Sequence, residues 1–176
     1  MEFVDEWLHQ TFFGTECTFG DDRSLTNFVI RKYQATYSIE AKAYTVVPDK
    51  LSTYIRQQQR WKKSWIRETF IASMFVWRKN PVAAFFFYSY IFLAFSAPIV
   101  FAHALIWSPL LYHIAPWIYL LGLLLMLMMH GVYYRIHVGK RPWIFSVAMF
   151  WIYSVLLMWQ LPWALVTIAD TRWGTR

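Results

Sequence analysis

Cysteine and charged residues are both scarce in this chain of 176 residues. The single cysteine, Cys17, excludes an internal disulfide and points to a reducing compartment for the polar part of the chain. Charged residues make up 15%, against 58% hydrophobic and 21% aromatic residues, which excludes a water-soluble core for most of the chain. Residues 1–6 are acidic and lack a basic region followed by an apolar core, so they are not a signal peptide.

The chain contains three long runs of apolar residues. No Lys, Arg, Asp or Glu occurs in residues 82–107 or 110–134, and each run is long enough to cross a hydrocarbon core of about 30 Å. A third run, 143–169, also has that length, but Gln160 and Pro162 interrupt it. The residues alone leave open whether this third run crosses the membrane or lies in its interface.

The net charge of +7 is concentrated beside these runs, in residues 50–79, 135–141 and 172–176. Such placement is typical of contact with anionic lipid and not of nucleic-acid binding. Because Lys and Arg are enriched in cytoplasmic loops, residues 50–80 and 135–141 are predicted to lie on the cytoplasmic side.

The first third of the chain predicts a mixture of helix and strand. The spacing of apolar residues favours helices over 2–12 and 24–32. The β-branched and aromatic residues within 33–47 favour one or two short strands. Asp49 is predicted to cap the helix that follows.

Residues 50–77 are predicted to form an amphipathic helix in the plane of the membrane interface, either continuous or broken between Trp61 and Trp65. One stripe of this helix carries four cations, Arg56, Arg60, Lys63 and Arg67. Another stripe carries four apolar residues, Ile66, Phe70, Met74 and Trp77.

Asp21 and Asp22 form the one adjacent pair of aspartates in the chain. Two close carboxylates can raise the pKa of one of them and so produce a general base, with Arg23 holding the other ionised. Gly20 would allow a tight approach of the backbone. The alternative is a structural one, in which the pair caps the helix that begins at Ser24.

Two further groups of residues are suited to a polar, anionic ligand at the membrane face. Gln57, Arg60 and Trp61 combine an amide, a planar cation suited to phosphate, and an indole that can stack on a sugar. The alternative is an ordinary interfacial helix. At the end of the chain, Trp173 and Arg176 could close over an anionic ligand or belong to a frayed tail.

Taken together, these motifs resemble hyaluronan synthases, most closely those of the algal-virus (chlorovirus) type. The resemblance rests on four stretches in this order: Cys17–Asn27, Tyr44–Pro48, Gln57–Ser64 and Trp173–Arg176. Hyaluronan synthases are membrane-integrated, processive family 2 glycosyltransferases. The Gln-x-x-Arg-Trp element is shared by processive synthases at large, whereas Gly-Asp-Asp-Arg is the more discriminating motif.

The resemblance implies a role for each motif residue at the acceptor. Asp22 matches the base that deprotonates the acceptor hydroxyl of the growing polymer, and Asp21 its supporting carboxylate. Trp61 would stack on the acceptor sugar, Gln57 would contact it, and Cys17 would lie beside it.

At the donor, the resemblance implies that Arg60, Trp173 and Arg176 bind the UDP diphosphate, with the last two forming a gate. A tail that reaches a cytosolic site requires 143–169 to be interfacial or re-entrant and not a single crossing. Enzymes of this kind use Mg²⁺ or Mn²⁺ held by an Asp-x-Asp motif, which this sequence lacks. We therefore expect no metal ligands here and no polymer synthesis by this chain alone.

The predicted fold is an α/β remnant of a GT-A glycosyltransferase domain, followed by an α-helical membrane region with two or three transmembrane helices. Residues 1–49 are predicted to be the GT-A portion, 50–80 the interfacial helices and 81–134 the two spans. Residues 135–169 are predicted to form a cytosolic loop with an interfacial or re-entrant helix, and 170–176 the gate. The expected partners are UDP-GlcNAc, UDP-GlcUA, the nascent polysaccharide and the bilayer, with the catalytic part on the cytosolic side of the plasma membrane.

Two alternatives stay open. A chitin-synthase-like polymerase would use UDP-GlcNAc only. A non-catalytic membrane protein or channel-forming segment would explain the apolar runs but not the joint presence and order of four motifs.

Overall fold

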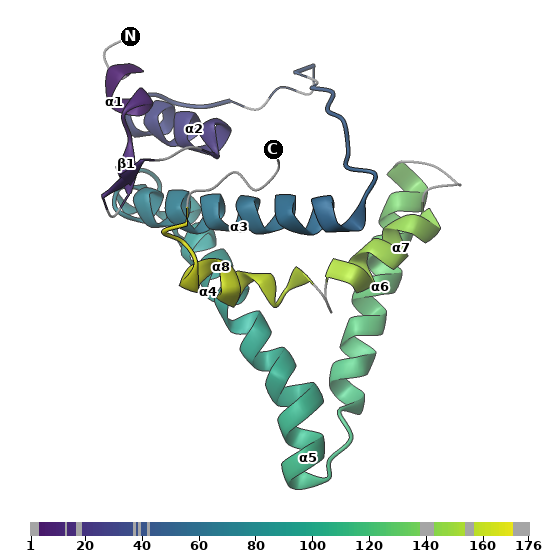
Figure 1. Ribbon diagram of the computed structural model, residues 1–176. Coiled ribbons are helices and arrows are strands. Elements are labelled where there is room, and N and C mark those ends of the chain that lie inside the picture. The colour runs from purple at the N-terminus through teal and green to yellow at the C-terminus, as the bar shows by residue number, and fades with distance from the viewer. Residues whose placement is uncertain are drawn as a thin grey trace. The chain divides into compact units, whose positions relative to one another are not determined.

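The computed structural model describes residues 4–12, 14–16, 19–36, 38, 40–41, 43–137, 143–153 and 157–170. The chain divides into two compact units, residues 1–91 with 160–176 and residues 92–159. Helices dominate both units (Figure 1). Each unit is described below by itself.

The N-terminal segment forms a short helix and a tight hairpin. Helix α1 covers Val4–Leu8, and strands β1 (Thr11–Phe12) and β2 (Thr15–Glu16) pair antiparallel. Gly14, at φ 77°, allows the turn between them, because a side chain at that φ would be strained. The predicted helix over 2–12 is therefore too long, since its last residues pair as a strand.

Helix α2 covers Asp21–Lys32 and begins three residues earlier than the spacing of apolar residues indicated. The strands predicted within 33–47 are wrong: none of the described residues in that range is in a strand. Tyr44 and Val46 are more than 90% exposed, because no neighbouring strand in the described part of the chain pairs with this stretch. Strand propensity cannot act without such a partner.

Helix α3 covers Leu51–Ser73 without a break, and the short 3-10 helix η1 follows at Val76–Arg78. The predicted cap is wrong, because Lys50 precedes the first turn and no side chain caps it. The cation stripe does not face outward along its length. Lys63 and Arg67 are 9% and 4% exposed, since α2 and α8 pack over this part of α3.

Two helices are long and apolar enough to cross a membrane. The first runs from Pro81 to Tyr112 as α4 (Pro81–Ala102), the π-helical η2 (His103–Trp107) and α5 (Ser108–Tyr112). The second is α6, Trp117–His137. Asn80 Oδ1 accepts hydrogen bonds from the backbone N–H groups of Val82 and Ala83, at 2.9 and 3.1 Å, and so caps the first helix.

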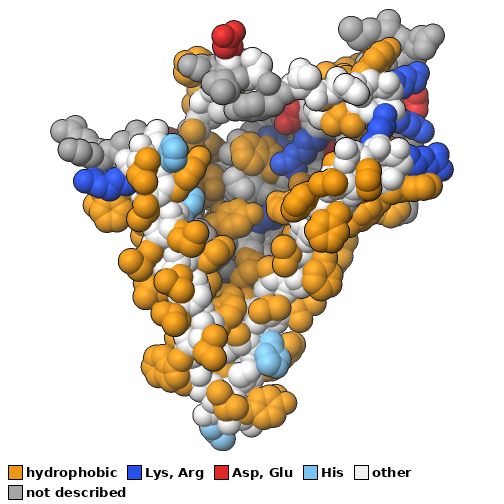
Figure 2. All heavy atoms as spheres, turned by 180° about the vertical axis from the view of Figure 1, so that it is seen from behind, with side chains coloured by type: hydrophobic (Ala, Val, Ile, Leu, Met, Phe, Trp, Pro, Cys, Tyr) orange, Lys and Arg blue, Asp and Glu red, His pale blue; other side chains and the backbone are white. Residues whose placement is uncertain are grey.

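The apolar side chains of these two helices are exposed in the chain by itself. Only 17% of the most apolar window of the first helix is buried, and 6% of that of α6. Figure 2 shows hydrophobic side chains along both. Exposed apolar surface of this extent fits lipid contact better than a soluble core. The non-helical link between the helices covers residues 113–116, because the first helix continues to Tyr112.

Within the described residues the third apolar run contains helices α7 (Trp143–Ile152) and α8 (Gln160–Val166), and the turn at residues 158–159 separates α8 from what precedes it. Within its own unit α7 packs against α6, and α8 packs along α3. This division is compatible with an interfacial or re-entrant element, which stays a prediction.

Candidate functional site

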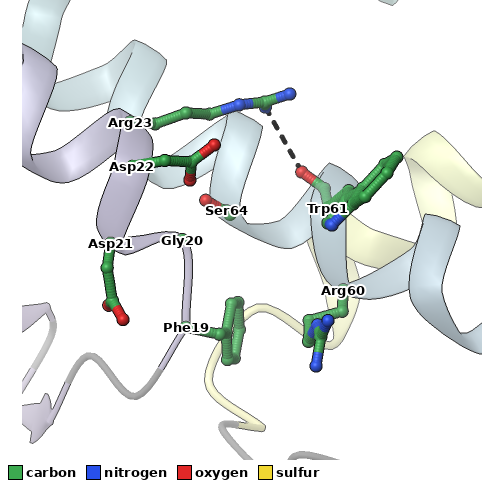
Figure 3. A pocket seen from close by; sticks show the side chains of 8 residues that line it. All are labelled: Phe19, Gly20, Asp21, Asp22, Arg23, Arg60, Trp61 and Ser64. Atoms are coloured by element: carbon green, nitrogen blue, oxygen red, sulfur yellow. Dashed lines mark hydrogen bonds between the residues drawn. The ribbon is translucent and has the colours of Figure 1, made fainter. Parts of the chain in front are cut away.

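The amino end of α2 and the middle of α3 enclose a pocket of about 410 Å³. Its lining joins two motifs that lie far apart in the sequence (Figure 3): Phe19, Gly20, Asp21, Asp22, Arg23, Arg60, Trp61 and Ser64. Acidic, basic and aromatic side chains therefore meet around one polar cavity. The structure brings together four of the eight predicted site residues, namely both aspartates, Arg60 and Trp61.

The loop before α2 lies against α3 at a point where only glycine fits. Gly20 has φ 85°, and a Cβ built there would collide with the Ser64 side chain and lie 3.2 Å from Arg67 Nη2. Ser64 is 2% exposed, and its hydroxyl has no hydrogen-bond partner within the described part of the chain. Glycine therefore sets how closely the Asp21–Asp22 pair approaches α3.

A buried charged cluster holds this loop in place. Arg67 Nη2 donates to the carbonyl of Phe19 at 2.5 Å, and Arg67 Nε donates to Glu68 Oε1 at 2.8 Å. Both side chains are 4% exposed. Asn27 Nδ2 on α2 donates to Glu68 Oε2 at 2.8 Å. The cluster therefore ties α3 both to the residue that precedes Gly20 and to the body of α2.

The acidic pair does not have its predicted structural use as a cap, whereas its use as a source of a general base stays a prediction. Neither aspartate caps α2, because Gly20 occupies the capping position and no side chain bonds there. Asp22 points toward the side of the pocket where Ser64 and Trp61 lie, whereas Asp21 points elsewhere (Figure 3). The two carboxylates therefore do not face each other across a shared proton. Arg23 Nη1 donates to the carbonyl of Trp61 at 3.4 Å, which directs its guanidinium to α3 and not to a carboxylate.

The remaining predicted site residues lie beside the pocket or outside the described residues. Gln57 lies on α3 one turn before Trp61 and does not line the pocket. Cys17, Trp173 and Arg176 lie outside the described residues.

The last described residue of the chain lies against α3. Lys63 Nζ donates to the carbonyl of Asp170 at 3.0 Å and lies 3.9 Å from its carboxylate. Helix α8 is attached nearer the start of α3, where Gln160 Nε2 donates to the carbonyl of Ile55 at 3.2 Å. Asp170 therefore lies against α3 at Lys63, two residues beyond Trp61 in the sequence.

Gly20→Ala is expected to destabilise the fold by about 2.5 kcal/mol, because it adds left-handed strain to a collision with Ser64. Gly14→Ala is the matched control, since Gly14 also has positive φ but nothing lies within 4 Å of its Cβ position. It should cost about 1 kcal/mol. Thermal unfolding in detergent micelles measures both, and equal losses would mean that the close approach at Gly20 is unimportant.

Burial lowers the pKa of Lys62, on the α8 side of α3, to about 8. Its amine donates to Gln160 Oε1 at 3.4 Å. Between pH 8 and 10.5 the folded protein has lost a proton that the unfolded chain keeps, so the free energy of unfolding rises with pH in this range.

The melting temperature is therefore expected to rise between pH 7 and pH 9 relative to that of Lys62→Met, which lacks the titrating amine. Melting curves that change in parallel over this range would contradict the buried position of Lys62.

No cluster of three or more His, Cys, Asp or Glu side chains suited to a metal ion occurs within the described ranges. The diverging carboxylates of Asp21 and Asp22 do not form a chelating pair either (Figure 3). The residues of this pocket thus do not fit a divalent metal.

The chain is similar over nearly its whole length to curated vertebrate proteins. It is 31% identical over 182 residues to hyaluronan synthase 3 of Gallus gallus, covering 99% of this chain and 30% of the relative. The chain is 31% identical over 182 residues to human hyaluronan synthase 3, covering 99% of this chain and 31% of that relative. Hyaluronan synthase 2 of Bos taurus gives 32% over 184 residues, with the same coverage. No family model and no solved structure matches the chain.

Matches of this extent show that the chain is similar to a segment of glycosyltransferases, and its two apolar helices suit a membrane. More particularly, it is a hyaluronan synthase-like polypeptide that spans about three tenths of the length of the curated relatives it matches. The narrower resemblance to the algal-virus type stays a prediction.

Three residues of the site were not singled out from the sequence. Arg67 was named only as part of the cation stripe, because its spacing from Lys63 and Arg60 gives no sign of which face of α3 is buried. Ser64 and Phe19 lie within the motif stretches, but nothing in their spacing indicates that both line the pocket or that the Phe19 carbonyl accepts a hydrogen bond from Arg67.

Proposed function

We propose that this chain supplies the acceptor side of the catalytic centre of a membrane hyaluronan synthase, which polymerises UDP-GlcNAc and UDP-GlcUA and exports the polymer through its own channel. One observation carries the proposal. The Gly-Asp-Asp-Arg and Gln-x-x-Arg-Trp motifs form one pocket, joined by the hydrogen bond from Arg23 to Trp61. The similarity to hyaluronan synthases over 99% of the chain supports it.

In this proposal Asp22 is the general base. Its carboxylate takes the proton of the acceptor hydroxyl while that oxygen bonds to the anomeric carbon of the donor sugar. The bond from that carbon to UDP breaks, and its electron pair leaves with the diphosphate. Arg60, on the opposite side of the pocket, would stabilise the charge that develops on the leaving group. Asp21 would support Asp22 electrostatically from the same turn.

The acceptor sugar would lie on the indole of Trp61, which is 47% exposed and so has a face available for stacking. Gln57, one turn earlier on α3, would donate to or accept from the sugar hydroxyls. Cys17 would stand beside the acceptor. In this arrangement α3 forms the collar through which the polymer passes.

Trp173 and Arg176 would close over the diphosphate as a gate. The anchoring of Asp170 by Lys63 supports this role, because Trp173 follows three residues later and an extended chain covers about 10 Å in that distance.

A Mg²⁺ or Mn²⁺ ion used by the complete enzyme would be held by residues outside this chain. On the same reasoning residues 1–49 are a remnant of the GT-A domain, and the chain alone makes no polymer. We place α3 and the pocket on the cytosolic side of the plasma membrane, since Lys and Arg concentrate there, with no role for nucleic acid.

A graft tests this function. The aligned segment of chicken hyaluronan synthase 3 is replaced by these 176 residues, and membranes are supplied with both UDP-sugars and Mg²⁺. Hyaluronidase-sensitive polymer is expected. A parallel graft of the human hyaluronan synthase 3 segment controls for the junctions. Polymer from the human graft and none from an equally abundant, membrane-inserted graft of this chain would contradict the proposal.

A further inference from the structure

A second concave surface lies near the carboxyl end of α3, away from the site described above. It has a volume of about 420 Å³ and is lined by Arg31, Ile71, Met74, Phe75, Arg78 and Lys79. Three cationic and three apolar side chains form this lining, and no acidic side chain is among them. We call this surface the basic pocket.

The cations of the basic pocket are held near one another but are not neutralised. Lys79 Nζ donates to the carbonyl of Arg31 at 2.9 Å, which joins the end of α2 to the start of the membrane region. The guanidinium of Arg31 lies 3.9 Å from Glu6, and both side chains are more than 60% exposed, so this ion pair is weak. Arg78 stacks over the ring of Trp77 at 4.7 Å.

The basic pocket directly precedes the first candidate span, which begins at Pro81, two residues after Lys79. Met74 and Trp77 are 57% and 56% exposed beside it. In Figure 2, Lys and Arg side chains gather above the hydrophobic side chains of that helix. The cations of the basic pocket therefore lie where lipid headgroups would be, and the apolar surface of the helix begins where the acyl chains would begin.

We propose that Arg31, Arg78 and Lys79 bind the phosphate-bearing headgroup of an anionic phospholipid such as phosphatidylserine. Two guanidinium groups and an ammonium match the phosphate and carboxylate oxygens of that headgroup. The apolar side chains of Ile71, Met74 and Phe75 would contact the upper part of an acyl chain. Free phosphate has no apolar part that could make this contact. The inference goes beyond the proposed function, because the lipid would fix the end of α3 at the membrane without entering the catalytic pocket.

Native mass spectrometry of the full chain in uncharged detergent micelles tests the proposal. The chain is titrated with dioleoyl phosphatidylserine, dioleoyl phosphatidylcholine or inorganic phosphate. Phosphatidylserine is expected to bind about tenfold more tightly than phosphatidylcholine, and millimolar phosphate should not displace it. The double variant Arg78→Gln/Lys79→Gln should lose about tenfold in affinity for phosphatidylserine and keep its affinity for phosphatidylcholine.

Arg56→Gln/Arg135→Gln is the matched control, because it removes two exposed cations from other parts of the chain. Its affinity for phosphatidylserine should stay within twofold of that of the unaltered chain. Arg31→Gln gives a second variant of the pocket if the first fails to fold. Equal binding of the two lipids, equal losses in pocket and control variants, or displacement by phosphate alone would each overturn the proposal.

Discussion

Replacing Arg67 by Met should destabilise the α2–α3 unit by about 3–5 kcal/mol. Arg67 and Glu68 are each 4% exposed and are joined at 2.8 Å. Removing the guanidinium leaves the Glu68 carboxylate buried with only Asn27 as a described hydrogen-bond donor to it. It also removes the donor to the Phe19 carbonyl, so the loop that carries Asp22 loses its attachment to α3.

The double variant Arg67→Met/Glu68→Leu separates these effects. It removes both buried charges and should recover most of the lost stability, because a buried ion pair replaced by apolar residues is often close to neutral. Arg56→Met is the control, since Arg56 is exposed on the same helix and its loss should cost less than about 0.5 kcal/mol. Fluorescence-monitored thermal unfolding in micelles should show a drop of about 10 °C for Arg67→Met. A drop no larger than that of Arg56→Met would show that the buried cluster does not hold the loop.

The membrane helices were the part of the fold most open to prediction from the sequence. Hydropathy is a local property, and the predicted run 82–107 falls within the candidate span Pro81–Tyr112. The predicted run 110–134 coincides with the second span, Trp117–His137, only from residue 117 onward, because the first helix continues to Tyr112. The cap at Asn80 is also local, because its side chain bonds two and three residues ahead. Such features depend on neighbours in the sequence alone.

Features that depend on distant partners were predicted poorly. The strands expected within 33–47 require a partner strand that the described part of this chain does not provide. The burial of Lys63 and Arg67 within the cation stripe of α3 was not predicted, because periodicity reveals that a helix has a face but not what packs against it. Neither charge pattern nor spacing indicated that Arg67 would be buried.

The candidate site shows the same division. The spacing of Gly20–Arg23 and Gln57–Trp61 in the sequence does not indicate that the two motifs lie together. The resemblance to hyaluronan synthases assigned both motifs to one site, and the structure places residues of both around one pocket. Which carboxylate faces the pocket could not be foreseen either. Asp21 and Asp22 are adjacent on a helix and must therefore point in different directions, about 100° apart around the axis.

The second large effect concerns Asp22. Asp22→Asn in the grafted synthase is expected to lower hyaluronan synthesis by about 10²–10⁴-fold, since an amide cannot accept the acceptor proton. Asp21→Asn should lower it by less, because its side chain does not point toward Ser64 and Trp61 (Figure 3). Asp49→Asn, an exposed carboxylate beyond the pocket, should leave synthesis unchanged.

The rate of hyaluronan synthesis by the Asp22→Asn graft, measured at equal membrane abundance beside the Asp49→Asn graft, is the most direct test of the catalytic site. A loss of at least 100-fold confined to Asp22→Asn is the predicted result. Synthesis at the rate of the Asp49→Asn graft would contradict the assignment of the α2–α3 pocket as the catalytic site.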